Sequence, residues 1–167
     1  MPLLKDGRPA DDPFVSFSDE EKLPDGASAI VSLERWRAER DLLISRNGPV
    51  GVRLRSDQRA QEIAGDLDRI SVIAIEFPVF SDGRGYSTAR LLRERYGYRG
   101  ELRAVGDVLR DQFLFLLRCG FDALEVADDA TAEAWNEAVG EFTVWYQPTA
   151  DGLMSALALR HRLAAAE

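Results

Sequence analysis

The chain has little cysteine, little histidine and no long apolar run, and each shortage excludes a class of protein. Cys119 is the single cysteine and His161 the single histidine among 167 residues. One cysteine forms no intrachain disulfide, and these two residues cannot build a cysteine-rich zinc or iron–sulfur site. No apolar stretch approaches the ~18 residues of a membrane-spanning helix, and the N-terminus lacks a basic region followed by an apolar run. We therefore expect a cytoplasmic protein with no metal, no cofactor and no membrane partner.

Positive charge is also scarce over the chain as a whole. The 21 lysines and arginines are outnumbered by 29 acidic residues, which gives a formal net charge of -8 and a pI near 4.8. This balance argues against a nucleic-acid partner. The charge is uneven, however, because residues 83–119 hold eight arginines against four acids.

The composition and the pattern of apolar residues predict one α/β domain. A hydrophobic content of 46% in 167 residues is ample for a single core. Residues 1–27 carry turn signals and are expected to form an irregular lead-in or small hairpin. In residues 28–167 short apolar runs alternate with helical patterns, which is typical of a mainly parallel sheet of about five strands flanked by helices on both faces. Such a sheet is either open and doubly wound or a partial barrel.

The expected strands follow these apolar runs. They are Ala29–Ser32, Val50–Leu54, Val72–Phe77, Glu101–Val105 and Ala123–Val126, with Phe142–Tyr146 as a candidate sixth.

Residues typical of helix ends fall between the expected strands. The candidate N-caps are Ser32, Ser56, Ser87, Asp107 and Asp128. Gly48 and Gly120 are candidate C-caps, and a last helix is expected from about Asp151 to Ala164.

Four expected strands contain a single charged residue among apolar neighbours. These residues are Arg53, Glu76, Arg103 and Glu125, and their signs alternate along the chain. If consecutive strands are neighbours in space, the four side chains could pair across the sheet. One interpretation is a structural row of ion pairs near the strand ends. The other makes the row the floor of a polar site.

Two short loops, SDGRGYS and VGD, each leave an apolar run and open a helical pattern. Open α/β sheets bind ligands at such points. The candidate ligand-binding residues are Asp82, Gly83, Arg84, Gly85, Tyr86, Ser87 and Asp107. Glycines on both sides of Arg84 let the backbone approach a ligand, and the guanidinium could make a two-pronged contact with a small anion. The alternative is a glycine-rich turn whose arginine pairs with Asp82, Glu76 or Asp107.

The other residues that could carry chemistry have simpler interpretations. Asp107 is explained as an N-cap, although a general acid or base role is open if it faces the Arg84 loop. Cys119 is expected to be packed and inert, since no resolving cysteine or nearby histidine supports a redox role. Thr88 stands where a dinucleotide fingerprint needs its third glycine. The sequence therefore identifies no catalytic residue.

Residues 77–126, with the phrases DGRGYS and GELRAVGDVLRDQ, resemble the central signature of a family of uncharacterised bacterial proteins. The similarity covers about residues 28–147. Members of this domain family of unknown function are often labelled oxidoreductases of sulfite reduction. The resemblance implies an association with assimilatory sulfite reduction, and it transfers no catalytic residue.

Two classes of function follow from the resemblance and the residues together. The first is an accessory protein that supports sulfite reductase or its electron supply and carries no redox group of its own. The second is a small enzyme, an oxidoreductase by the family label, that acts on an anionic substrate at residues 82–87.

Overall fold

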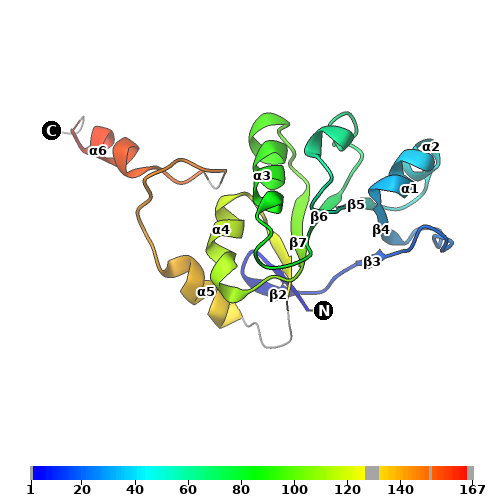
Figure 1. Cartoon of the computed structure of the whole chain (residues 1–167), viewed down its shortest axis with the longest axis horizontal. Helices are drawn as coiled ribbons and strands as arrows, with labels where there is room; N and C mark the ends of the chain where they lie inside the picture. Colours follow the sequence, from blue (N-terminus) through cyan, green and yellow to red (C-terminus); the bar gives the residue numbers. More distant parts are fainter. Residues whose placement is uncertain (1, 127–131, 151, 165–167) are drawn as a thin grey trace.

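The computed structural model describes residues 2–126, 132–150 and 152–164, and its strands form one eight-stranded sheet (Figure 1). The strands are β1 (Leu3–Lys5), β2 (Arg8–Ala10), β3 (Phe14–Ser16), β4 (Ser28–Ser32), β5 (Val50–Leu54), β6 (Val72–Phe77), β7 (Glu101–Gly106) and β8 (Ala123–Glu125). The α-helices are α1 (Leu33–Ala38), α2 (Arg40–Ser45), α3 (Arg84–Arg90), α4 (Phe113–Arg118), α5 (Ala132–Gly140) and α6 (Ala156–Ala164). Shorter helical turns are η1 (Ala60–Ile63), η2 (Leu91–Arg95) and η3 (Arg110–Gln112).

The order of the strands is β2-β1-β8-β7-β6-β5-β4-β3. Strands β3 to β8 are parallel and lie in chain order, whereas β1 pairs antiparallel with β8 and with β2. The predicted α/β class is confirmed. The predicted sheet of about five parallel strands is wrong, because the sheet is mixed and has eight strands. The additional strands β1, β2 and β3 all come from residues 1–27.

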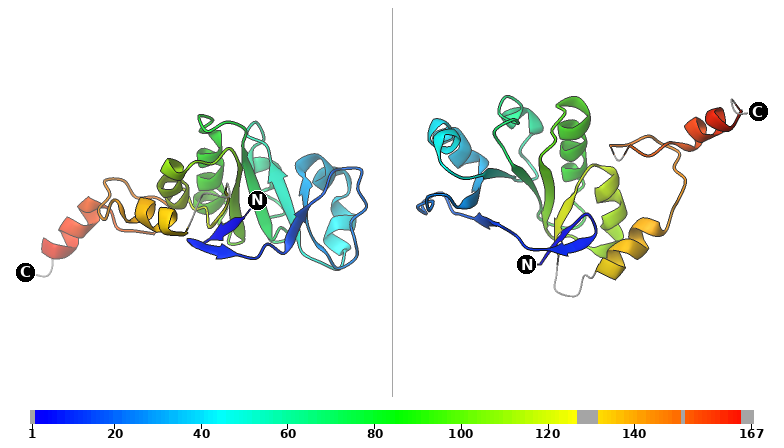
Figure 2. Two further views of the ribbon diagram at one scale, coloured as in Figure 1. Left: turned by 90° about the horizontal axis from the view of Figure 1, so that it is seen from below. Right: turned by 180° about the vertical axis from the view of Figure 1, so that it is seen from behind.

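The helices pack on one face of this sheet, and the sheet curls into a half-barrel. Right-handed crossovers between parallel strands in chain order all turn the same way, so each connecting helix falls on the same face. Figures 1 and 2 show α1 to α5 fanned along the convex face. The prediction of helices on both faces is therefore wrong, as is the doubly wound alternative, and the structure corresponds to the partial barrel. We call the face opposite the helices the concave face.

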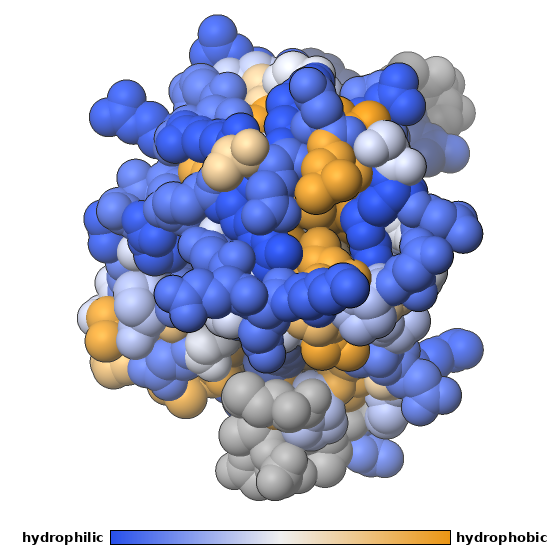
Figure 3. All heavy atoms as spheres, turned by 90° about the vertical axis from the view of Figure 1, so that its right-hand side faces the viewer, coloured by the Kyte–Doolittle hydropathy of each residue, from blue (hydrophilic) through white to orange (hydrophobic). Residues whose placement is uncertain are grey.

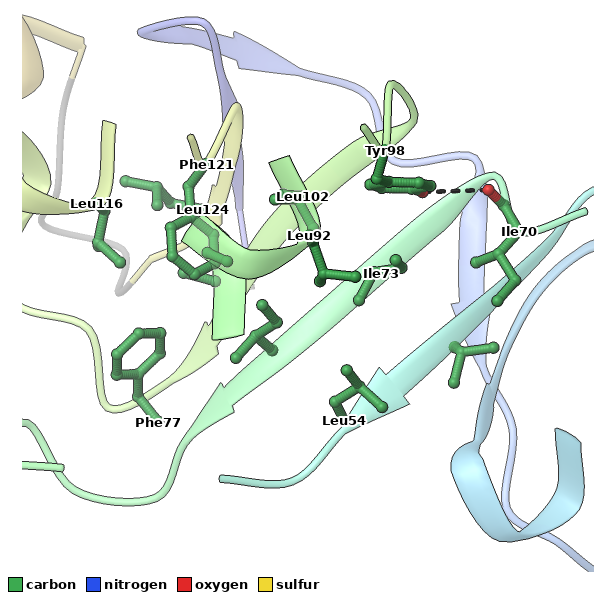
Figure 4. Packing of buried hydrophobic residues seen from close by; sticks show 14 of the residues in the cluster. Leu54, Ile70, Ile73, Phe77, Leu92, Tyr98, Leu102, Leu116, Phe121 and Leu124 are labelled. Atoms are coloured by element: carbon green, nitrogen blue, oxygen red, sulfur yellow. Dashed lines mark hydrogen bonds between the residues drawn. The ribbon is translucent and has the colours of Figure 1, made fainter. Parts of the chain in front are cut away.

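Side chains of β6 divide between two cores because alternate residues of a strand point to opposite faces. Ile73, Ile75 and Phe77 belong to the main core, which also contains the buried residues of the helices (Figure 4). Val72 and Ala74 belong to a second, smaller cluster on the concave face, together with Ile30, Val105 and the partly buried Phe14. The five predicted strands are thus buried on both faces, which explains their nearly continuous apolar sequences.

The N-terminal segment joins both edges of the sheet. Asp6 and Gly7 both have positive φ, 49° and 74°, as the two central residues of a tight β1–β2 hairpin require. From β2, beyond β8, residues 11–13 run below the sheet to β3 at the opposite edge (Figures 1 and 2). Asp12 pairs with Arg103 of β7 on the way. The segment is therefore part of the sheet and of its concave face.

Some predicted helix ends are confirmed. The Ser32 hydroxyl accepts a hydrogen bond of 2.9 Å from the Arg35 amide and caps α1. Gly120 directly follows Cys119, the C-cap of α4, and has the positive φ (96°) that favours glycine there. The prediction of Gly48 as a C-cap is wrong, because α2 is capped by Arg46 and Gly48 lies two residues further on.

Other predicted helix ends are wrong. Ser87 lies inside α3, which begins at Arg84. Ser56 precedes no helix, because η1 begins at Ala60 and Ser56 instead accepts a hydrogen bond from Arg84. Asp128 lies outside the described residues.

The C-terminal region departs from the prediction as well. Phe142–Tyr146 is not a strand; Trp145 forms one isolated bridge with Ser155. The last helix, α6, begins at Ala156, and Asp151 lies outside the described residues. α6 has no buried residue and stands away from the sheet (Figure 1). In the described ranges no helix is long and apolar enough to cross a membrane.

Candidate functional site

The Arg84 guanidinium at the start of α3 is held by its neighbours. Its Nε and Nη2 donate to the two carboxylate oxygens of Asp82, at 2.9 and 2.6 Å, and Nη2 also donates to the Ser56 hydroxyl at 2.9 Å. The hydrogen bond from Arg84 is the main reason why the pKa of Asp82 lies well below its ordinary value. Of the two interpretations of this loop, the structure has the turn in which Arg84 pairs with Asp82. A ligand role for residues 82–87 stays a prediction.

Gly85 and Tyr86 position α3 against the sheet. A Cβ at Gly85 would lie 2.7 Å from the Phe77 ring, so only glycine lets the helix approach β6 this closely. The Tyr86 ring meets the Phe77 ring edge-on, with 5.3 Å between centroids. These contacts place the beginning of α3 on the helix-covered side of the sheet, and they give Gly85 a packing role.

Asp107 fixes the loop that follows β6. Its carboxylate accepts a 2.9 Å hydrogen bond from the Phe80 amide, and its own amide donates to the Phe77 carbonyl at 2.8 Å. The Gln112 side chain donates to the Phe80 carbonyl and to the Tyr86 hydroxyl. The prediction of Asp107 as an N-cap is wrong, because η3 begins at Arg110. Asp107 holds residues 78–82 in place, while the Phe80 side chain remains 56% exposed.

The four charged strand residues all lie on the concave face, in two rows. Register places Arg53 and Arg103 on either side of Ala74. Glu76 stands beside Val105 one pleat further on, and Glu125 follows in the neighbouring strand β8. The two arginines thus lie in one row and the two glutamates in the other, and the rows are occupied by alternate strands, so the signs alternate along the chain.

Arg103 anchors one half of this arrangement. It is 1% exposed and contacts three carboxylates: Asp12, Glu101 and Glu125. Its Nη1 lies 3.5 Å from Glu125, so one pair of the predicted row forms. The rest of its charge is balanced by Asp12 and Glu101, which the sequence pattern did not identify. This half of the row is structural.

Arg53 and Glu76 form no ion pair within the described part of the chain. Both are partly buried on the concave face. The Arg53 Nε is buried without a hydrogen-bond partner among the described residues. Arg103 lies on the same face but has three carboxylate partners.

The predicted site residues therefore fall into two groups. Asp82 to Ser87 and Asp107 meet at the carboxyl ends of β6 and β7, linked through Phe80, Gln112 and Tyr86. The four strand charges project from the opposite side, since Glu76 and Phe77 alternate along β6. Neighbouring loops were predictable from the parallel strand order. The loop residues and the strand charges lie on opposite faces because the helices cover one face only. The sequence did not reveal that arrangement of the helices.

A third feature, the α4–α5 groove, was missed by sequence reasoning. It is a cavity of about 680 Å³ between α4, α5 and residues 142–149. Its apolar lining includes Leu114, Phe115, Phe142, Val144, Trp145 and Tyr146. The signal was present in FLFLL of α4, because a helix that is apolar on all sides needs a second partner besides the sheet.

The opposite end of the molecule differs in character. There α1, α2 and β3 show mostly hydrophilic residues, with a narrow band of apolar ones (Figure 3). Large aromatic side chains exposed by more than half occur at the α4–α5 groove: Phe115 at 64%, Phe142 at 54% and Tyr146 at 90%.

Two residues of chemical interest from the sequence remain. Cys119 is half-buried and lines the α4–α5 groove. His161 is exposed on α6. Among the described ranges, no group of three histidine, cysteine, aspartate or glutamate residues is placed to hold a metal ion.

Comparison with known protein families identifies the family of this chain. The model of a family described as a bacterial protein of unknown function, DUF934, matches residues 51–157. That span includes most of β5, all of β6 to β8, the Asp82–Ser87 loop and the α4–α5 groove. No match was found among curated proteins. The family description carries no activity, so the link to sulfite reduction stays a prediction.

Proposed function

Because the chain belongs to the DUF934 family of bacterial proteins of unknown function, we propose a function from its own surface: an accessory protein of assimilatory sulfite reduction. In this proposal it binds sulfite reductase or its electron donor through the α4–α5 groove. The resemblance of residues 77–126 supports the pathway, and the groove supports the mode of action.

The groove carries the proposal because it exposes large apolar side chains in one place. Contiguous apolar surface of this kind marks binding sites, and aromatic residues dominate the energetics of protein interfaces. Phe115 projects from the outer side of α4, while Phe142 and Tyr146 come from the segment after α5. Three aromatic side chains thus converge from two separate parts of the chain.

The partner's chemistry follows from the charges around the groove. Its lining includes three arginines, Arg90, Arg110 and Arg118, against Asp111 and Glu141. The chain as a whole carries -8. Arg90 and Arg110 are each paired with an acid outside the lining, Glu94 and Glu137 respectively, so the groove carries little net charge. It fits a mainly apolar protein segment.

The enzyme alternative receives no support from the Arg84 loop, because Asp82 and Ser56 occupy the guanidinium. A two-pronged contact of an anion with Nε and Nη2 would have to displace that carboxylate.

Growth of a deletion strain tests the pathway. Deleting the gene should impair growth on sulfate or sulfite as sole sulfur source, and added cysteine should restore it. Normal growth of the deletion strain on sulfate would contradict the assignment to sulfite reduction.

A further inference from the structure

Arg53 is partly buried and has no hydrogen-bond or ion-pair partner among the described residues. Its Nε is buried and makes no hydrogen bond there, and its guanidinium makes no ion pair with those residues. Arg103, level with it on the same face, meets three carboxylates. Withdrawing a charged group from water without a partner is costly. The contrast indicates that Arg53 is placed for a partner from outside the chain.

A cavity lies directly beside this arginine. It has a volume of about 310 Å³ and is lined by Arg53, by Ser16 and Ser18 from the N-terminal segment, and by Asp19 and Ser32. That volume is at the small end of the range for small-molecule pockets. Ser32 ends β4 and Arg53 is the penultimate residue of β5. The cavity therefore lies toward the carboxyl ends of parallel strands, where such sheets bind ligands.

We propose that this cavity binds a small organic acid that carries its own hydrogen-bond donor, such as an α-hydroxy or α-amino acid. The planar fork of Arg53 matches a carboxylate, and its Nε is one of the donors left unsatisfied. The carboxylate of Asp19 also lines the cavity and accepts a 2.6 Å hydrogen bond from the Ser32 hydroxyl.

The requirement for a hydrogen-bond donor on the ligand follows from Asp19. A carboxylate has about four acceptor positions, and Ser32 uses one of them. A hydroxyl or ammonium group on the ligand would donate to Asp19 while the ligand's carboxylate meets Arg53. An inorganic oxyanion without a donor could still meet Arg53, but it would bring negative charge toward Asp19 without a hydrogen bond to that carboxylate, which weakens its binding. The cavity thus selects against simple anions.

This inference is independent of the proposed function. The cavity lies on the concave side, between β4, β5 and residues 16–19, whereas the α4–α5 groove lies among the helices. Failure of small-molecule binding in the cavity would therefore not affect the test of protein binding at the groove, and the converse also holds.

Isothermal titration calorimetry with four probes tests the proposal: lactate, L-alanine, propionate and sulfate, at matched ionic strength. Lactate or L-alanine should bind saturably, and propionate and sulfate should bind at least tenfold more weakly. Arg53→Met should abolish binding. Asp19→Asn should retain binding of lactate but reduce its preference over propionate. Arg69→Met, which removes an exposed arginine elsewhere, should bind as the wild type does.

Three results would overturn the proposal. They are no saturable binding of lactate or L-alanine, unchanged binding by Arg53→Met, and sulfate or propionate binding as tightly as lactate. Thermal melts check that each variant is folded. If Arg53→Met does not fold, Arg53→Lys keeps the charge without the fork, and it should bind at least tenfold more weakly; equal binding would contradict the site.

Discussion

The Arg103 guanidinium donates to both carboxylate oxygens of Asp12, which lies 91 residues earlier in the chain. This pair ties the segment between β2 and β3 to the middle of the sheet. Arg103 is 1% exposed, and Glu101 and Glu125 complete its surroundings. The concave face is therefore held together by a charge cluster that no short stretch of sequence contains.

Asp12→Asn should lower the free energy of unfolding by about 1–3 kcal/mol at neutral pH, because it removes a charge-assisted pair from a buried arginine. Burial works to raise the pKa of Asp12, but hydrogen bonds from Arg103 and from the Phe14 amide outweigh it and the pKa is lowered. The stabilisation is thus fully present above the ordinary value of 3.8 and is lost as the pH falls through the lower pKa of the folded state. Urea unfolding at several pH values measures this. A difference between variant and wild type that persists undiminished at the acid end would contradict the role of the pair.

Gly85→Ala should destabilise the protein by about 1–3 kcal/mol, because the added methyl would lie 2.7 Å from the Phe77 ring. Gly83→Ala is the matched control two residues away. Its methyl would meet Tyr86 at 3.8 Å, an ordinary contact, and should cost no more than about 1 kcal/mol. Chemical denaturation of both variants compares them. Equal stability of the two would show that Gly85 does not set the distance between α3 and β6.

Tyr98→Phe should cost about 1 kcal/mol, because the hydroxyl donates to the buried Ile70 carbonyl at 3.1 Å (Figure 4). Burial also raises the pKa of Tyr98 above its ordinary range. In a chain of this size the loss corresponds to a fall in melting temperature of about 2–4 °C. Tyr96→Phe serves as the control, since Tyr96 is only partly buried. A fall no larger than that of the control would contradict a stabilising hydrogen bond.

Arg84→Ala should complement a deletion strain on sulfate, because Arg84 is bound to Asp82 and Ser56 and the proposed function lies at the α4–α5 groove. The melting temperature should change little, since Arg84 is an exposed side chain. Loss of complementation by a folded Arg84→Ala would favour the enzyme alternative. In that case Arg84→Lys should rescue only in part, because a point charge cannot reproduce the fork.

Five of the six parallel strands, β4 to β8, were predictable because their residues are apolar on both faces and carry β-branched side chains. Val50–Leu54 and Val72–Phe77 agree with β5 and β6 residue for residue, and the other three agree within one residue at each end. A small hairpin was one of the two predictions for residues 1–27, and β1 and β2 form one. That β1, β2 and β3 join the sheet was not predicted, because each has three residues, too few to show a period, and β2 contains Pro9. Their place in the sheet depends on long-range pairing.

The main feature of the candidate site that the sequence predicted is that the two loops after β6 and β7 lie next to each other. Adjacent loops after adjacent parallel strands explain why Asp82 and Asp107 are linked through Phe80. The partners of Arg103 and the isolation of Arg53 depend on the N-terminal segment crossing the concave face. The α4–α5 groove depends on how residues 142–149 lie against α4, and the sequence there indicated a strand instead.

Phe115→Ser combined with Tyr146→Ser removes the two most exposed aromatic side chains of the groove, at 64% and 90% exposure, with little effect expected on folding. Phe80→Ser is the control, because Phe80 is exposed to a similar degree but does not line the groove. Light scattering should show the wild type and all variants as monomers. A wild-type dimer that the double substitution dissociates would identify a second copy as the occupant and contradict the proposed partner.

The most direct measurement is the binding of the purified protein to purified sulfite reductase and to its purified electron donor, by surface plasmon resonance. We predict saturable binding of the wild type and of Phe80→Ser to one of these two proteins. Binding by the Phe115→Ser, Tyr146→Ser double variant should be at least tenfold weaker. Absence of wild-type binding to both proteins, or equal binding by the double variant, would contradict the proposed function.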